Sequence, residues 1–121
     1  MELHDKVRSW PRTPANDPFF TGSLALALQL EQASGLPVIL GFNEFCAPSL
    51  DEALEQATLG AERVLVITPM MTRGGEHSEQ DIPECIRRVQ CHHPQANIQY
   101  IWPFDVNEVA RFLAEQVTRH Q

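Results

Sequence analysis

One stretch of this sequence concentrates the residue types that can do chemistry. It runs from Thr68 to Pro83, reads TPMMTRGGEHSEQDIP, and holds two adjacent glycines, one histidine and three acidic residues. An imidazole can bind a transition metal or transfer a proton near neutral pH. We therefore single out His77 as the first candidate, with a solvated loop histidine as the alternative interpretation.

A second candidate is Glu44, which lies within an apolar run between Phe42 and Phe45. A carboxylate in that setting would be half-buried, and a buried carboxylate without a partner is costly. It is either a structural partner of a backbone amide or an arginine, or a functional group that faces His77. An imidazole and a carboxylate together can hold a divalent metal such as iron, cobalt, nickel or zinc, or act as general acid and base.

Apolar runs and helix signals alternate along the chain and predict the elements that position these residues. A glycine after one helical segment, Gly35, and a Ser49–Glu52 capping box before the next mark helix ends. Strands are predicted over Leu36–Phe45, Arg63–Thr68 and Asn97–Trp102, and helices over Phe20–Ala33, Leu50–Gly60, Pro83–His92 and Val106–Arg119. Asp105 is predicted to cap the last helix. The apolar residues predicted to face inward from the last two helices are Ile82, Ile86 and Val89, and then Val109, Phe112, Leu113 and Val117.

This alternation predicts the α/β class, a three-layer domain with a small parallel sheet and helices on both faces. We expect one domain over residues 1–121, with an irregular segment over 1–16. Because the carboxyl ends of parallel strands meet at one edge, Glu44 and His77 should converge there, near Trp102 and Phe104. Glu79 and Asp81 are expected to cap and charge the start of the following helix.

Composition excludes several classes of protein. The formal net charge is -7 and the pI is near 5.1, which disfavours nucleic acid and anionic membranes as partners. No apolar run reaches the length of a membrane span, and no signal peptide is visible. Three cysteines without a C-x-x-C pair indicate a reduced, cytoplasmic protein. Gly74-Gly75 does not extend to a nucleotide-binding fingerprint, so no nucleotide is expected.

Two segments together resemble a known family. Residues 75–83, GEHSEQDIP, are similar to the G-x-H-x-x-x-D-I-P segment of the small sirohydrochlorin chelatases, the CbiX/SirB cobaltochelatase and ferrochelatase group. Residues 42–50, FNEFCAPSL, are similar to the strand of that family that ends in Glu and precedes Pro-Ser-Leu. The resemblance covers roughly residues 17–118.

The resemblance implies a chelatase-like fold and a function in cobalamin or siroheme biosynthesis. A chelatase of this kind, a lyase, inserts Co²⁺ or Fe²⁺ into a tetrapyrrole without ATP, with Ni²⁺ as a further candidate metal. His77 and Glu44 would be the catalytic and metal-binding residues. The tetrapyrrole would lie against Met70, Met71, Trp102 and Phe104, for which ordinary core or rim packing is the alternative.

One feature of the family pattern has no counterpart in this sequence. Family members begin with an apolar strand that ends in His-Gly-Ser or His-Gly-Gly, whose histidine is a second metal ligand. Three explanations are open: the sequence is truncated at its start, a neighbouring subunit completes the site, or the protein is a degenerate homologue that binds metal or tetrapyrrole without insertion. An unpaired parallel edge also favours association, so we expect a homodimer or a larger homo-oligomer.

Overall fold

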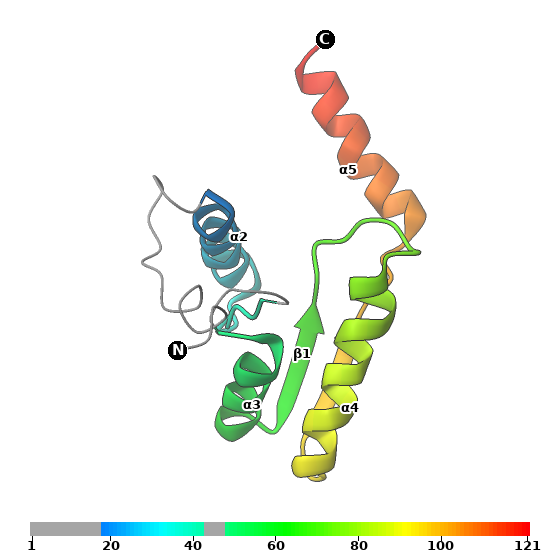
Figure 1. Ribbon diagram of the computed structural model, residues 1–121. Coiled ribbons are helices and arrows are strands. Elements are labelled where there is room, and N and C mark those ends of the chain that lie inside the picture. The colour runs from blue at the N-terminus through cyan, green and yellow to red at the C-terminus, as the bar shows by residue number, and fades with distance from the viewer. Residues whose placement is uncertain (1–17, 43–47) are drawn as a thin grey trace. The chain divides into compact units, whose positions relative to one another are not determined.

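The computed structural model describes residues 18–42 and 48–121 (Figure 1). The chain divides into two compact units, Met1–Ala61 and Glu62–Gln121. Helices and a small parallel sheet confirm the predicted α/β class. No helix in the described ranges is long and apolar enough to cross a membrane. The irregular segment expected over residues 1–16 lies outside those ranges, and the assignment of the whole chain to one domain stays a prediction.

The described part of the first unit contains α2 (Pro18–Ser34) and α3 (Leu50–Gly60). Gly35 follows α2 with a φ of +73°, the left-handed conformation that ends many helices. Ser49 and Glu52 form the predicted capping box, in which each side chain accepts the other residue's backbone N–H, at 3.2 and 3.1 Å. Local sequence signals thus fix both of these helix ends.

The strand predicted over Leu36–Phe45 is not formed in its described part, which ends at Phe42. Phe42 makes an isolated parallel bridge with Ser49: its N–H donates to the Pro48 carbonyl at 2.9 Å, and its carbonyl accepts the Leu50 N–H at 3.0 Å. These partners are close neighbours in the chain, at the start of α3. The sheet of the described residues therefore has two strands, where the sequence predicted three.

The side chain of Phe42 packs on α2 although the described part of its segment forms no strand. It is buried, and its ring centroid lies 5.9 Å from that of Phe19 and 5.7 Å from that of Phe20, both on α2. Edge-on and tilted aromatic contacts at such distances are favourable. Phe42 is the buried residue of the described run, whereas Leu36 and Ile39 are 54% and 42% exposed, so the burial expected of a strand covered on both faces is found only at Phe42.

The second unit is built on a parallel pair of strands, β1 (Arg63–Ile67) and β2 (Asn97–Ile101). Their register runs from Arg63 opposite Asn97 to Ile67 opposite Ile101, so the two strands end side by side. Both strands have the predicted first residue and end one residue earlier than predicted. Their common carboxyl end is the edge at which the sequence places the chemistry.

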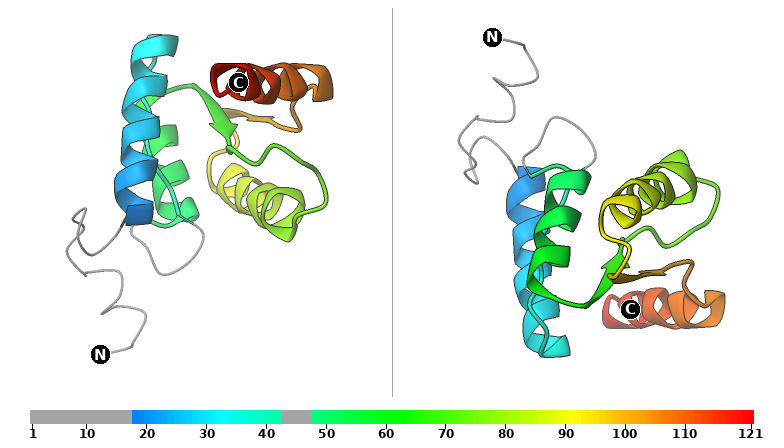
Figure 2. Two further views of the ribbon diagram at one scale, coloured as in Figure 1. Left: turned by 90° about the horizontal axis from the view of Figure 1, so that it is seen from above. Right: turned by 90° about the horizontal axis from the view of Figure 1, so that it is seen from below.

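Helices cover the two sides of this strand pair. The π-helical turn η1 (His77–Asp81) and α4 (Ile82–His92) connect β1 to β2, and α5 (Val106–Arg119) follows β2. In the two views of Figure 2, α4 and α5 lie on opposite sides of the strands. This arrangement agrees with the predicted layering of helices on both faces of a small sheet.

The core of the second unit lies between the strands and α4. Val64 is buried, and Ile82, Cys85 and Val89 on α4 are 4%, 2% and 1% exposed. Spacings of three and four residues place these three side chains on one face of the helix. The sequence predicted Ile86 on this face; it is half-buried, and Cys85 occupies the core position.

The last helix, α5, forms where predicted but does not bury its apolar stripe. Asp105 caps it by accepting the N–H groups of Asn107 and Glu108, at 2.7 and 3.2 Å. Phe112 and Val117 are 48% and 60% exposed, and no residue of α5 is buried. The expectation of a buried stripe was wrong for the described structure, because an amphipathic pattern sets a helix face without supplying the surface that covers it.

Candidate functional site

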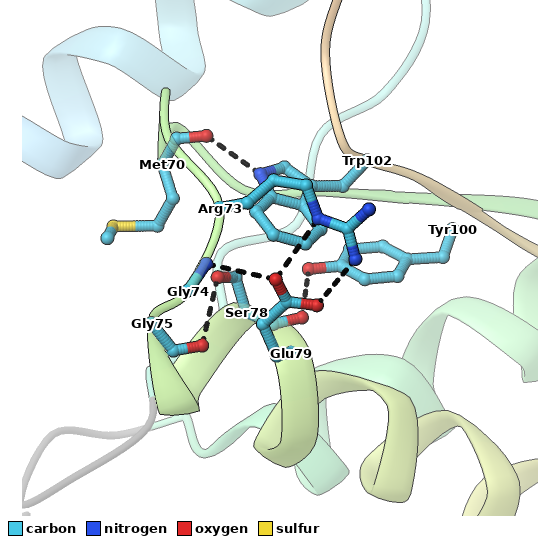
Figure 3. Close-up of polar contacts among 8 residues, drawn as sticks. All are labelled: Met70, Arg73, Gly74, Gly75, Ser78, Glu79, Tyr100 and Trp102. Carbon is cyan, nitrogen blue, oxygen red and sulfur yellow. Dashed lines mark hydrogen bonds and ion pairs between the residues drawn. The ribbon is translucent and has the colours of Figure 1, made fainter.

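The candidate site is the loop that leaves β1 and enters η1, together with the end of β2. Thr68, the first residue after β1, is buried, whereas Met70, Met71 and Arg73 in the loop are exposed. The sequence predicted this location, because parallel α/β sheets carry their ligand sites at the carboxyl ends of the strands. Figure 3 shows the polar contacts that hold the loop.

A single carboxylate closes the loop. Glu79 Oε1 accepts Arg73 Nη2 at 2.9 Å, and Glu79 Oε2 accepts Arg73 Nε at 3.1 Å and the Gly74 N–H at 2.9 Å. The hydrogen bond from Arg73 lowers the pKa of the Glu79 carboxyl, with a further contribution from the Gly74 N–H. Gly74 has a φ of +98°, which a glycine adopts without strain. The Glu79 side chain therefore reaches back across the loop and binds two residues that precede it, Arg73 and Gly74.

The end of β2 fastens the other side of the loop. Trp102 Nε1 donates to the Met70 carbonyl at 2.8 Å, and the Arg73 guanidinium lies 5.6 Å from the centre of the Trp102 ring, within cation–π range. The Trp102 ring also stacks on Tyr100, with 5.9 Å between centroids and 21° between planes. Trp102 was predicted as a tetrapyrrole contact; in this structure its indole N–H anchors the loop.

A π-helical turn begins at His77. The Ile82 N–H donates to the His77 carbonyl, five residues earlier, which widens the turn by one residue. The same pattern would next require an N–H from residue 83 for the Ser78 carbonyl, but Pro83 has none. The Tyr100 hydroxyl donates to the Ser78 carbonyl instead, at 2.9 Å. Turns of this kind occur frequently at functional sites.

The hydroxyl of Tyr100 is part-buried where it contacts the π-turn. Burial raises the pKa of its hydroxyl, and the nearby negative charge of Glu79 raises it further. Ser78, whose carbonyl it binds, is fully buried, and the Ser78 Oγ lies 3.4 Å from the Gly75 carbonyl to which it donates. The base of the π-turn is thus fixed from β2.

His77 is the half-buried imidazole of this turn, with 34% of its side chain exposed. Its Nδ1 is buried and has no hydrogen-bond partner among the described residues; the nearest charged group is Asp81 Oδ2, at 3.7 Å. A buried polar atom without a partner is unusual in a folded protein, which marks His77 as a candidate functional residue. The arrangement can present an imidazole to a metal or to a proton donor.

The structure corrects the capping role expected for the acidic residues of η1. Asp81 is the N-cap residue of α4 but makes no side-chain capping hydrogen bond, and its backbone is helical. An N-cap side chain reaches back to the first turn from an extended backbone, and the π-turn that precedes α4 removes that geometry. Asp81 instead faces the His77 ring, and Glu79 closes the loop.

The remaining predicted site residues are only partly placed. Glu44 lies outside the described residues, so its pairing with His77 stays a prediction. Met70 and Met71 are 39% and 44% exposed, and Phe104 is half-buried. Within residues 18–42 and 48–121, no group of three or more His, Cys, Asp or Glu side chains could hold a metal ion.

Sequence reasoning missed two residues that shape this site, Arg73 and Tyr100. Arg73 stands six residues before Glu79, outside the spacings at which helical side chains meet, so no periodic pattern pairs them. Tyr100 lies 22 residues from its partner Ser78. The available signal was Pro83, because a proline after a short polar turn leaves a carbonyl without a backbone donor.

Comparison with known proteins agrees with the resemblance found in the sequence. The family model CbiX matches residues 22–120. A sirohydrochlorin ferrochelatase from Priestia megaterium is 31% identical over 78 residues, which is 63% of this chain and 29% of that protein. The matched segment therefore covers less than a third of the length of that relative. Because the family model covers most of the sequence, including the loop and η1, this chain belongs to the CbiX family.

Proposed function

We propose that this protein takes part in inserting a divalent metal, Co²⁺ or Fe²⁺, into a sirohydrochlorin-like tetrapyrrole without ATP. Family membership supports chelatase chemistry, and the relative from Priestia megaterium is a sirohydrochlorin ferrochelatase. The observation that carries the proposal is the half-buried His77 imidazole, whose Nδ1 lies 3.7 Å from Asp81 Oδ2, as in metal-binding histidines that direct one ring nitrogen to a carboxylate and keep the other for the metal. It stands on a π-turn at the carboxyl edge of a parallel strand pair.

In this proposal His77 holds the incoming metal through Nε2, and Nδ1–H faces Asp81. Histidine ligands of metals generally direct the other ring nitrogen to a carboxylate or carbonyl, which fixes the tautomer and the ring orientation. The Asp81 oxygen at 3.7 Å is close enough to reach hydrogen-bond distance by a small rotation of either side chain. Asp81 would thus orient the ligand without binding the metal.

The reaction exchanges one metal ion for two protons. As the macrocycle nitrogens bind the metal, two pyrrole N–H groups lose their protons to nearby bases, so charge is conserved. His77, once it has released the metal, can accept one of these protons, because a neutral imidazole serves both as a ligand and as a base. Glu44 is proposed as the facing carboxylate that shares the metal and accepts the other proton.

The tetrapyrrole is proposed to lie over the exposed loop residues Met70 and Met71. Methionine side chains are flexible and polarisable and adapt to flat apolar ligands. Phe104 is proposed as a further contact. The Trp102 ring can still present an edge or face to the macrocycle, although its N–H is engaged with the Met70 carbonyl.

The test is a spectrophotometric insertion assay on the recombinant protein with sirohydrochlorin and Co²⁺, or Fe²⁺ without oxygen. We expect conversion faster than the uncatalysed reaction, and we expect His77→Ala to abolish the excess. His92→Ala is the matched control, because His92 lies at the far end of α4. Equal rates for native protein and His77→Ala would refute the proposed role; saturable Co²⁺ binding without insertion would assign the protein to non-catalytic metal binding.

A further inference from the structure

We infer that Arg73, Glu79 and Trp102, here called the loop brace, are positioning residues for His77. They fasten the loop to η1 and to the end of β2, and so hold the imidazole in one orientation. That these residues order the loop around His77 follows from their contacts alone. Its consequence for metal binding rests on the proposed function of His77.

The brace encloses His77 within a short closed segment. Glu79 follows His77 by two residues on η1, and its carboxylate accepts three N–H groups from Arg73 and Gly74, which precede His77 in the loop. A guanidinium that donates through Nε and Nη2 to both oxygens of one carboxylate fixes direction as well as distance. The backbone on either side of the histidine is therefore tied together.

The brace also connects this closed segment to the sheet. Trp102 binds the Met70 carbonyl through its indole N–H, and its ring lies under the Arg73 guanidinium. Tyr100 stacks on the same ring (Figure 3). Since Trp102 directly follows β2, these contacts tie the loop to the end of that strand.

Global stability does not explain these contacts. The Arg73 side chain is 66% exposed and that of Glu79 is 29% exposed, and ion pairs in contact with solvent contribute little to the free energy of unfolding. The loop contains two adjacent glycines, which would otherwise allow it many conformations. The effect of the brace is therefore local order around His77.

The same contacts make Glu79 unsuitable as a metal ligand. Both of its oxygens already accept N–H groups, and Arg73 compensates its charge. A carboxylate ligand would need a lone pair directed at the metal and would have to break these bonds. Glu79 therefore acts on the site by holding the backbone, and a metal bound at His77 takes its other ligands from elsewhere.

The test compares Glu79→Gln, Arg73→Lys and Trp102→Phe with a matched control, Glu84→Gln. Glu84 also forms an exposed pair with an arginine, Arg87, but on the outer side of α4. We expect Glu79→Gln to increase hydrogen exchange at the Gly74 N–H and to weaken Co²⁺ binding about 10-fold, the scale seen when a group that orients a metal ligand is lost. The control should change neither, and the melting temperature should move little in any variant.

The other two variants test the geometry of the brace. Arg73→Lys keeps the charge but loses the planar fork, so it should behave like Glu79→Gln. Trp102→Phe keeps the ring under Arg73 and loses the N–H bond to the Met70 carbonyl, so its Co²⁺ affinity should lie between those of Glu79→Gln and native protein. A lysine variant with native Co²⁺ affinity and native Gly74 exchange would overturn the inference.

Two outcomes separate the brace from the proposed function. If Glu79→Gln loosens the Gly74 N–H but leaves both Co²⁺ affinity and the His77 side-chain rotamer unchanged, the brace does not position His77 and the inference is wrong. If native protein and His77→Ala bind Co²⁺ equally, the proposed function fails. Three-bond couplings that report the His77 χ1 rotamer then test the loop brace by itself. If rotamer averaging of His77 in Glu79→Gln equals that in native protein, the inference is refuted; if the averaging increases, the inference is supported.

Discussion

The hydroxyl of Tyr100 supplies a sharp test of how the π-turn is stabilised. In the native structure it donates to the Ser78 carbonyl at 2.9 Å, which the π-helical pattern leaves without a donor because Pro83 has no N–H. Tyr100→Phe removes the oxygen and leaves the ring in its stack with Trp102. The substitution therefore isolates one hydrogen bond at the base of the candidate site.

The magnitude follows from what remains after the change. A part-buried carbonyl that loses its donor costs about 1–3 kcal/mol, and partial access of water favours the lower half of that range. We expect the free energy of unfolding to fall by about 1–2 kcal/mol at neutral pH. For a unit of this size that corresponds to a melting temperature roughly 4 °C lower or more.

A second substitution tests the cause assigned to this loss. Pro83→Ala restores an N–H that can bind the Ser78 carbonyl, so the cost of Tyr100→Phe should shrink by about 1 kcal/mol in the Pro83→Ala background. Thermal or denaturant unfolding of all four proteins measures the coupling. Equal costs of Tyr100→Phe in the two backgrounds would refute the explanation that the hydroxyl replaces the missing proline donor.

The pH dependence of stability tests the burial of the same hydroxyl. Burial raises the pKa of Tyr100 above its ordinary value of 10.0, so the native state binds this proton more tightly than the unfolded chain does. The associated stability is present below pH 10.0 and is lost as the pH rises through the native pKa. Tyr100 is the single tyrosine of the sequence, so tyrosinate absorbance reports this pKa directly. Native and denatured protein titrating at the same pH would contradict the burial.

Three further predictions concern backbone space and assembly. Gly74→Ala should lower the free energy of unfolding by about 1–2 kcal/mol, because a φ of +98° disfavours a side chain. Gly75→Ala, where a Cβ meets only ordinary contacts, should change it by less than about 0.5 kcal/mol. Equal unfolding midpoints for the two variants would contradict this difference. Gly41→Ala should lower the free energy of unfolding by about 1–3 kcal/mol, since its Cβ would lie 2.9 Å from the Cβ of Ala53 on α3. An unchanged denaturation midpoint would refute this and show that α3 moves to make room. The protein is expected to elute from a calibrated sizing column as a homodimer or larger, and a monomeric mass by light scattering would oppose this.

Local chemistry allowed the sequence to determine most helix and strand ends. The Ser49–Glu52 capping box, the glycine after α2 and the Asp105 cap are contacts within a few residues, so their patterns are visible in the chain. The apolar runs likewise predicted β1 and β2 to within a residue. The location of the loop followed from the parallel α/β order, because all strand ends of one direction share an edge.

Tertiary structure decided what the apolar segments pack against. The run over Leu36–Phe45 predicted a strand, but a strand forms only where a partner supplies hydrogen bonds. In the described part of this run, Phe42 finds its partners at the start of α3. The stripe of α5 predicted a buried face, which no periodic pattern can guarantee. Both errors arose because periodicity specifies which residues share a face and leaves open what covers it.

The inner arrangement of the candidate site also required the fold. The sequence identified His77 by its residue type and its loop, but not the π-turn on which it stands or the unpartnered Nδ1. Arg73 meets Glu79 across a turn, and Tyr100 reaches Ser78 from another strand. Such contacts depend on how the chain is brought together in space, so residue types alone could name the histidine while only the folded chain shows what holds it.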